Sequence, residues 1–112
     1  MTRKPEPQLE TITTHYADFW EKWLTPFFVN LYGSSGLDKK TVELIVTALL
    51  ALRGWETGVR THAALALEAG ATPEEIRGAI LITMGVGGVT SAASGMAWAE
   101  PILQAHASAN GT

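Results

Sequence analysis

Apolar residues recur at helical spacing along the chain. The first segment places large apolar residues three or four positions apart: Leu9, Ile12, Tyr16, Phe19 and Trp23. This spacing puts side chains on one face of a helix. No stretch alternates apolar and polar residues with the period of two that is typical of a strand. The pattern therefore predicts an all-α protein that begins with an amphipathic helix over residues 8–24.

Capping residues indicate where the next helices begin. Thr25 followed by Pro26 predicts the N-cap and first-turn proline of a short second helix, so that the first helix ends before Thr25. Asp38 is the predicted N-cap of a helix over residues 39–53, because its carboxylate can accept hydrogen bonds from the first backbone amides. A further helix is expected from about residue 55 to residue 69.

Residues that begin or end helices are also present in the last third of the chain. Thr72, with Glu75 three residues later, predicts a capping box at the start of a helix. The stretch "GVGG" at residues 85–88 is expected to end that helical region. A last helix is predicted over residues 89–106, with a kink or restart at Pro101.

The composition indicates one small domain, residues 1–112, that associates with copies of itself. Hydrophobic residues make up 46% of the sequence and charged residues 17%. A single copy of this size cannot cover so much apolar surface, and symmetric association converts exposed patches into interface. We therefore expect a homo-oligomer, with the aromatic residues of the first two helices adding to the surface to be covered: Trp20, Trp23, Phe27 and Phe28.

Charge and cysteine content exclude several classes of function. The net charge is -3 and the eight Lys and Arg residues are scattered, which argues against nucleic acid as a partner. With no cysteine, the chain has no disulfide, thiolate metal site or cysteine nucleophile. The uncharged run over residues 78–99 is broken by "GVGG", and the first ten residues lack the apolar core of a secretory signal. We expect a cytoplasmic protein that does not enter a membrane.

The candidate chemistry lies around "GWETGVRTH", residues 54–62. Helical spacing places Trp55, Gly58 and His62 on one face of the helix. Glu43 lies on the preceding helix among apolar residues, so its carboxylate must be exposed or paired. If the two helices form an antiparallel hairpin with a tight turn at "RGW", Glu43 comes to lie beside His62.

Each of these polar residues also has a purely structural interpretation. His62 can be a hydrogen-bonded histidine without a chemical role. Glu43 can form a surface ion pair with Lys39 or Lys40 of its own helix. Glu56 can stabilise the helix N-terminus or pair with Arg60 four residues later.

The segment beginning "LDKKTVELIVTALLALRGWETGVRTHAALALEAGATPEEI" resembles the core of the carboxymuconolactone decarboxylase and alkylhydroperoxidase D-like family. The resemblance covers about residues 37–100, and its most specific parts are "L-D-x-K-T-x-E-L-I" and "H-x-x-x-A-L-x-x-G-A-T-P-E-E-I". It implies an all-α fold built around a central antiparallel helical hairpin. It also implies a trimer or hexamer with active sites near subunit interfaces.

The resemblance also assigns roles to individual residues. In the peroxidase branch, two cysteines stand where this chain has Trp55 and Gly58, and the proton-relay Glu and His correspond to Glu43 and His62. A thiol peroxidase needs a thiolate, so a cysteine-free chain is not one. The resemblance therefore implies the decarboxylase branch, which acts on a lactone acid without metal or organic cofactor and carries a carboxylate at the position of Glu56.

We hypothesise a cofactor-independent lyase, decarboxylase or isomerase that acts on a lactone or carbonyl acid. His62 would be the general acid or base, and Glu43 and Glu56 would orient its ring or relay the proton. The predicted substrate pocket comprises Trp55, Gly58, Ser94 and Trp98, although tryptophans such as these are more often core residues than pocket residues. Two alternatives stay open: a metal protein with Glu43, Glu56 and His62 as ligands, and a non-catalytic oligomeric binding module that has lost the peroxidase cysteines.

Overall fold

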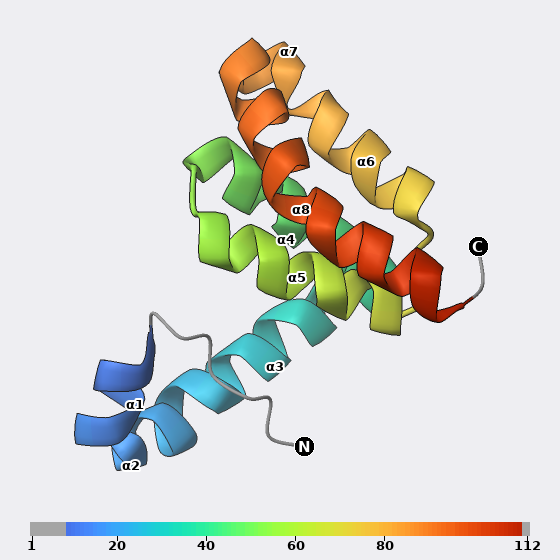
Figure 1. Ribbon diagram of the computed structural model, residues 1–112. Helices are drawn as coiled ribbons and strands as arrows, with labels where there is room; N and C mark the ends of the chain where they lie inside the picture. The colour runs from blue at the N-terminus through green and yellow to red at the C-terminus, as the bar shows by residue number, and fades with distance from the viewer. Residues whose placement is uncertain (1–8, 111–112) are drawn as a thin grey trace. The chain divides into compact units, whose positions relative to one another are not determined.

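The computed structural model describes residues 9–110, which are almost entirely helical and contain no strand (Figure 1). This confirms the all-α prediction. The chain divides into two compact units, with the boundary between Leu37 and Asp38. The elements of the first unit are α1 (Glu10–His15), α2 (Ala17–Phe19), η2 (Trp20–Leu24) and α3 (Thr25–Ser34). Those of the second are α4 (Lys39–Arg53), α5 (Glu56–Glu68), α6 (Pro73–Ile82), α7 (Met84–Gly87) and α8 (Val89–Ala109).

The first unit is helical but interrupted. Tyr16 leaves the helical region of backbone space, with φ -131° and ψ 45°, and so separates α1 from α2. The single helix expected over residues 8–24 is therefore divided, and its first residue lies outside the described range. None of the four elements of this unit contains a fully buried residue.

The predicted N-cap at Thr25 is wrong. Thr25 has helical φ and ψ, and its backbone N–H donates to the carbonyl of Trp20, five residues earlier. This is the bonding of a π-helical turn, which is wider than an α-helical one. Pro26 lacks an N–H, and its ring crowds an ordinary preceding turn. A widened turn just before it lets the helix continue where the sequence pattern indicated a break.

The hairpin of the second unit is made by local signals in the sequence. Asp38 caps α4 as predicted, because its carboxylate accepts a hydrogen bond of 2.7 Å from the backbone N–H of Thr41. Gly54 ends α4 in the left-handed conformation, with φ +83°, which glycine adopts without a steric penalty. Only Gly54 and Trp55 separate α4 from α5, so α5 runs back along α4.

The remaining helices close the second unit around an apolar core. The capping box predicted at Thr72 and Glu75 is present at the start of α6. Gly88, with φ +82°, separates α7 from α8, and α8 then continues through Pro101 without restarting. The fully buried apolar side chains come mainly from α5, α6 and α8: Val59, Ala63, Ala66, Ile76, Ile80, Ala99 and Leu103. Within the described residues, no helix is both long and apolar enough to cross a membrane.

A polar contact and a close backbone approach fix α8 in place. The guanidinium of Arg77 on α6 donates to both carboxylate oxygens of Glu100 on α8, at 2.6 and 3.2 Å. These bonds from Arg77 hold the pKa of Glu100 below its ordinary value. Gly95 lies so close to α4 that an added Cβ would come within 2.6 Å of the Ala51 Cβ. Glycine at this position therefore sets the spacing of α4 and α8.

Candidate active site

Glu43 and His62 form a buried pair between α4 and α5. Nδ1 of the imidazole lies 2.7 Å from Oε1 of the carboxylate. Only 4% of the surface of Glu43 and 3% of that of His62 is exposed. The proximity expected from the hairpin is therefore confirmed, and the alternative of a surface ion pair with Lys40 is wrong. Lys40 instead pairs with Glu75, at 3.2 Å.

A third buried polar residue, Thr47, bonds to the backbone beside the pair. The hydroxyl of Thr47 donates to the backbone carbonyl of Glu43 at 2.7 Å, and Thr47 has no exposed surface. Along α5, the neighbours Val59 and Ala63 are also completely buried. The pair thus lies in a buried part of the molecule, where an electrostatic interaction is less screened than at the surface.

The carboxylate determines which imidazole nitrogen carries the proton. A carboxylate oxygen only accepts hydrogen bonds, so in neutral His62 the proton is on Nδ1, which donates to Glu43. The lone pair is then on Nε2, which becomes the proton-accepting nitrogen. This arrangement can orient a general acid or base.

Glu56 is not part of this pair. Its carboxylate forms an ion pair with Arg60, one turn later on α5, and both side chains are partly exposed. The described residues contain no group of three His, Cys, Asp or Glu side chains that could hold a metal ion. The alternative that Glu56 joins Glu43 and His62 as a metal ligand is therefore wrong, because Glu56 is directed toward Arg60.

Trp55 and Gly58 pack against each other at the start of α5. A Cβ on Gly58 would come within 2.8 Å of Cε3 of the Trp55 indole and 2.9 Å of Cδ1 of Leu50. The indole therefore occupies space that only a glycine leaves open. The indole nitrogen is buried and has no hydrogen-bond partner within the described part of the chain. Neither residue lines the pocket described next.

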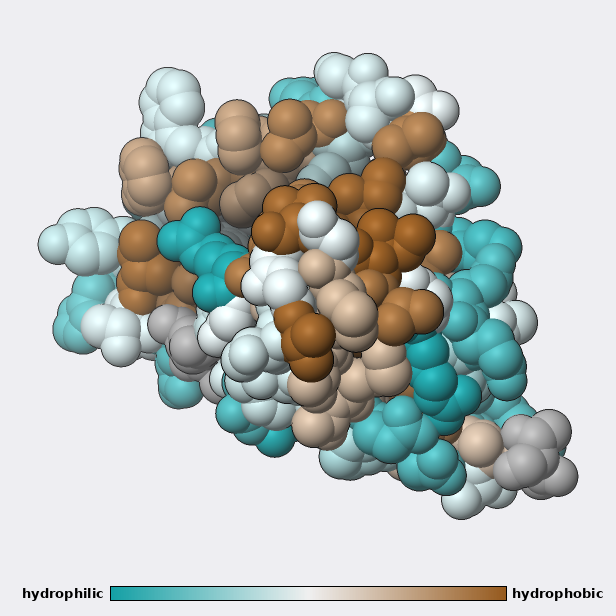
Figure 2. All heavy atoms as spheres, turned by 90° about the horizontal axis from the view of Figure 1, so that it is seen from above, coloured by the Kyte–Doolittle hydropathy of each residue, from teal (hydrophilic) through white to brown (hydrophobic). Residues whose placement is uncertain are grey.

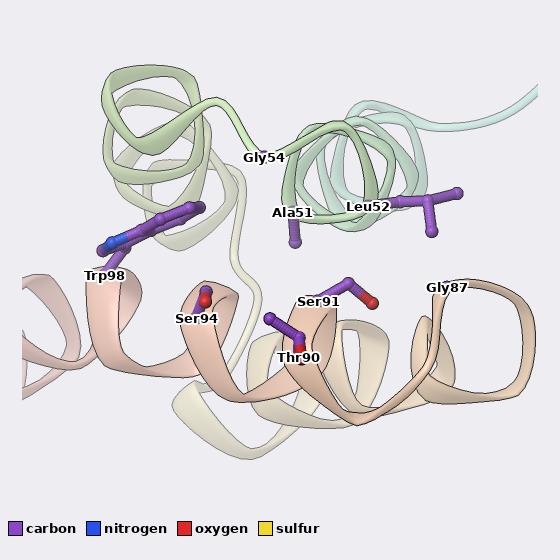
Figure 3. A pocket seen from close by; sticks show the side chains of 8 residues that line it. All are labelled: Ala51, Leu52, Gly54, Gly87, Thr90, Ser91, Ser94 and Trp98. Carbon is purple, nitrogen blue, oxygen red and sulfur yellow. The ribbon is translucent and has the colours of Figure 1, made fainter.

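An open pocket of about 260 Å³ lies between the end of α4 and the first half of α8 (Figure 3). Of the predicted pocket residues, Ser94 and Trp98 line it. The sequence analysis missed Thr90, although positions 90, 94 and 98 fall on one helical face. The other lining residues are Ala51, Leu52, Gly54, Gly87 and Ser91. Glu43 and His62 are not among them, so the pocket and the buried pair are separate features.

Comparison with known proteins identifies the family of the chain. The family model described as carboxymuconolactone decarboxylase family matches residues 17–101, which is well over half of the chain. The chain matches no curated protein and no solved structure. The matched range includes the Glu43 and His62 pair and nearly all of the pocket's helices. The chain therefore belongs to the carboxymuconolactone decarboxylase family, as a member without cysteine.

Proposed function

We propose that the protein is a cofactor-independent general acid/base enzyme, a decarboxylase or other lyase, or an isomerase, acting on a lactone or carbonyl acid. The observation that carries the proposal is the buried pair of His62 and Glu43, with 2.7 Å between Nδ1 and Oε1. A histidine held in one tautomer by a carboxylate is suited to act as a general acid or base. The family match supports the substrate class.

The proposed chemistry needs one proton carrier. When a carboxylate leaves as CO₂ from the carbon next to a ketone or lactone carbonyl, or from a carbon conjugated to that carbonyl through a double bond, the electron pair of the broken carbon–carbon bond remains on the substrate as an enolate. Protonated His62 delivers a proton from Nε2 to the enolate carbon and returns to the neutral form. Glu43 holds the ring through Nδ1 and stabilises the imidazolium before the transfer. Glu56, paired with Arg60, has no part in this path.

The test is turnover of carboxymuconolactone by the full-length protein in D₂O, followed by CO₂ release and by proton NMR. We expect CO₂ release together with one deuterium in the product at the protonated carbon, and no loss of rate after treatment with a chelator. Hydroperoxide supplied with a dithiol should be reduced no faster than in buffer, because no residue can form a sulfenate. Loss of turnover on chelation, or no turnover of this lactone and of a panel of β-keto acids, would contradict the proposal.

A second candidate function is a non-catalytic oligomeric binding module. It is favoured by the packing of Trp55 on Gly58, which fills the positions of the peroxidase cysteines with a close apolar contact. A binding module would take up a lactone acid without converting it. Saturable binding of carboxymuconolactone with no CO₂ release would therefore support this candidate over the enzyme.

We further propose that the protein is a homo-oligomer, a trimer or hexamer. Apolar side chains gather on the face seen in Figure 2, which looks down on the α7 end of the second unit. Large apolar residues around α7 are strongly exposed, with 75% of Ile82 and 81% of Val86 accessible. Patches of this kind on small proteins usually mark interfaces.

Light scattering at micromolar concentration should give the mass of three or six chains. Ile82→Asp should lower that mass, because a charge in an apolar interface loses its water without gaining a partner. Ala105→Asp, at an exposed position of α8, is the matched control and should leave the mass unchanged. A monodisperse monomer of the unaltered protein would contradict the proposal.

A further inference from the structure

We propose that the pocket between α4 and α8 binds a small uncharged ring molecule that carries oxygen acceptors, at a place separate from the Glu43 and His62 pair. This inference goes beyond the proposed function and does not depend on it. It rests on the chemistry of the lining residues, on their hydrogen-bonding state and on the size of the pocket.

The pocket is lined without a single charged side chain. Its α4 side is apolar, with Ala51 and Leu52, and one end is formed by the indole of Trp98 (Figure 3). A flat ring can stack on an indole, and stacked pairs add to the free energy gained from area burial alone. An ionised ligand would lose part of its hydration and find no opposite charge in the lining. The lining therefore favours an uncharged ring.

Hydroxyl groups on α8 supply the polar contacts. Ser91 is already occupied, since its hydroxyl donates to the carbonyl of Gly88 at 3.1 Å and lies 3.3 Å from the hydroxyl of Thr83. Thr90 is exposed and Ser94 is half-buried; their hydroxyls make no hydrogen bond to another described residue, and both residues line the pocket. A hydroxyl donates one hydrogen bond, so each can serve one ligand oxygen. These two side chains are one helical turn apart, as are Ser94 and Trp98.

The size of the pocket limits the ligand. Its volume of about 260 Å³ is below the range typical of sites for drug-sized molecules. At roughly 30 Å³ for each water in the liquid, it holds about eight waters. A bicyclic lactone such as coumarin is of a suitable size. Gly87 forms part of the pocket wall with its backbone alone. A Cβ at this position would overlap Cδ1 of Leu52, so the wall needs glycine here.

The experiment is a titration of the full-length ¹⁵N-labelled protein with coumarin, read on the indole N–H signals of its four tryptophans. Trp98→Phe assigns the signal of Trp98. We expect a saturable shift of that signal, and affinity at least tenfold lower for coumarin-3-carboxylate, which adds one negative charge. Ser94→Ala should weaken coumarin binding about three- to tenfold by removing one neutral hydrogen bond. Ser94→Leu should abolish binding by filling the pocket.

Matched controls separate this site from general effects and from the proposed catalysis. Ala93→Leu adds the same side chain at an exposed neighbouring position of α8 and should leave the affinity unchanged. His62→Gln should also leave it unchanged, whatever its effect on turnover. A Trp98 signal that does not respond, equal binding to Ser94→Leu, or tighter binding of the carboxylate would overturn the ligand assignment. Loss of binding in His62→Gln would overturn the separation of the two sites.

Discussion

Replacing His62 with alanine is expected to reduce turnover by about 10²–10⁴-fold, the range supplied by a positioned general acid or base. In the proposed reaction no other residue protonates the enolate, and the position of His62 is fixed by its contact with Glu43 at 2.7 Å. The loss should appear in kcat, because the imidazole acts on the reacting carbon and not on a remote part of the substrate. Steady-state CO₂ release measures it.

Glu43→Gln provides the matched variant for the other half of the pair. Glutamine keeps the length of the side chain but removes the charge that orients and stabilises the imidazolium, so we expect a loss on the order of 10²-fold. Residues that act as a unit are strongly non-additive. The double variant should therefore lose little more activity than His62→Ala alone. Losses that multiply would show that the two residues act independently.

The same variants should differ in stability in another order than they differ in activity. His62→Ala leaves the carboxylate of Glu43, 4% exposed, without the imidazole, and an uncompensated buried charge is strongly destabilising. Adding Glu43→Gln removes that charge, so the double variant should be more stable than His62→Ala in urea unfolding, while remaining inactive. Recovery of activity together with stability would contradict a chemical role for His62 and support a structural one.

The parts of the fold that were predictable from sequence depend on short-range chemistry. The N-cap at Asp38 and the capping box at Thr72 and Glu75 are formed by residues three positions apart, so the pattern alone specifies them. The proximity of Glu43 and His62 was also predictable from the sequence. A hairpin with a short turn fixes the register of its two helices, and counting residues on either side of the turn then places the two side chains together.

The features that were not predictable depend on backbone irregularity and on three-dimensional neighbours. The interruption at Tyr16 has no distinct sequence signal. Pro26 is a signal, but it indicated a break, and the structure instead has a π-helical turn before it. The pocket arises where α4 approaches α8, so half of its lining could not be found from one helix alone. Thr90 could have been found from its spacing to Ser94. Glu56 pairs with Arg60 one turn later on α5, as the structural alternative in the sequence predicted, and its catalytic role stays a prediction.

Gly95→Val is expected to cause the largest loss of stability among glycine substitutions. At this position on α8 a Cβ would lie 2.6 Å from the Cβ of Ala51 and 3.0 Å from Cγ2 of Ile80, and both neighbours are buried. The added atoms have no free volume to enter, so α8 must move away from α4. Overpacking of this kind costs about 3 kcal/mol of unfolding free energy for a bulky β-branched side chain.

Gly78→Ala is the matched control within the same unit. It lies in the interior of α6, and an added Cβ meets nothing within 4 Å. Alanine has higher helix propensity than glycine, so this variant should gain about 0.5–1 kcal/mol. Thermal unfolding should place Gly95→Val on the order of 10 °C below the unaltered protein and Gly78→Ala a few degrees above it. A melting temperature raised by both substitutions would contradict the prediction. It would show that α8 and α4 are not in tight contact where Gly95 faces Ala51.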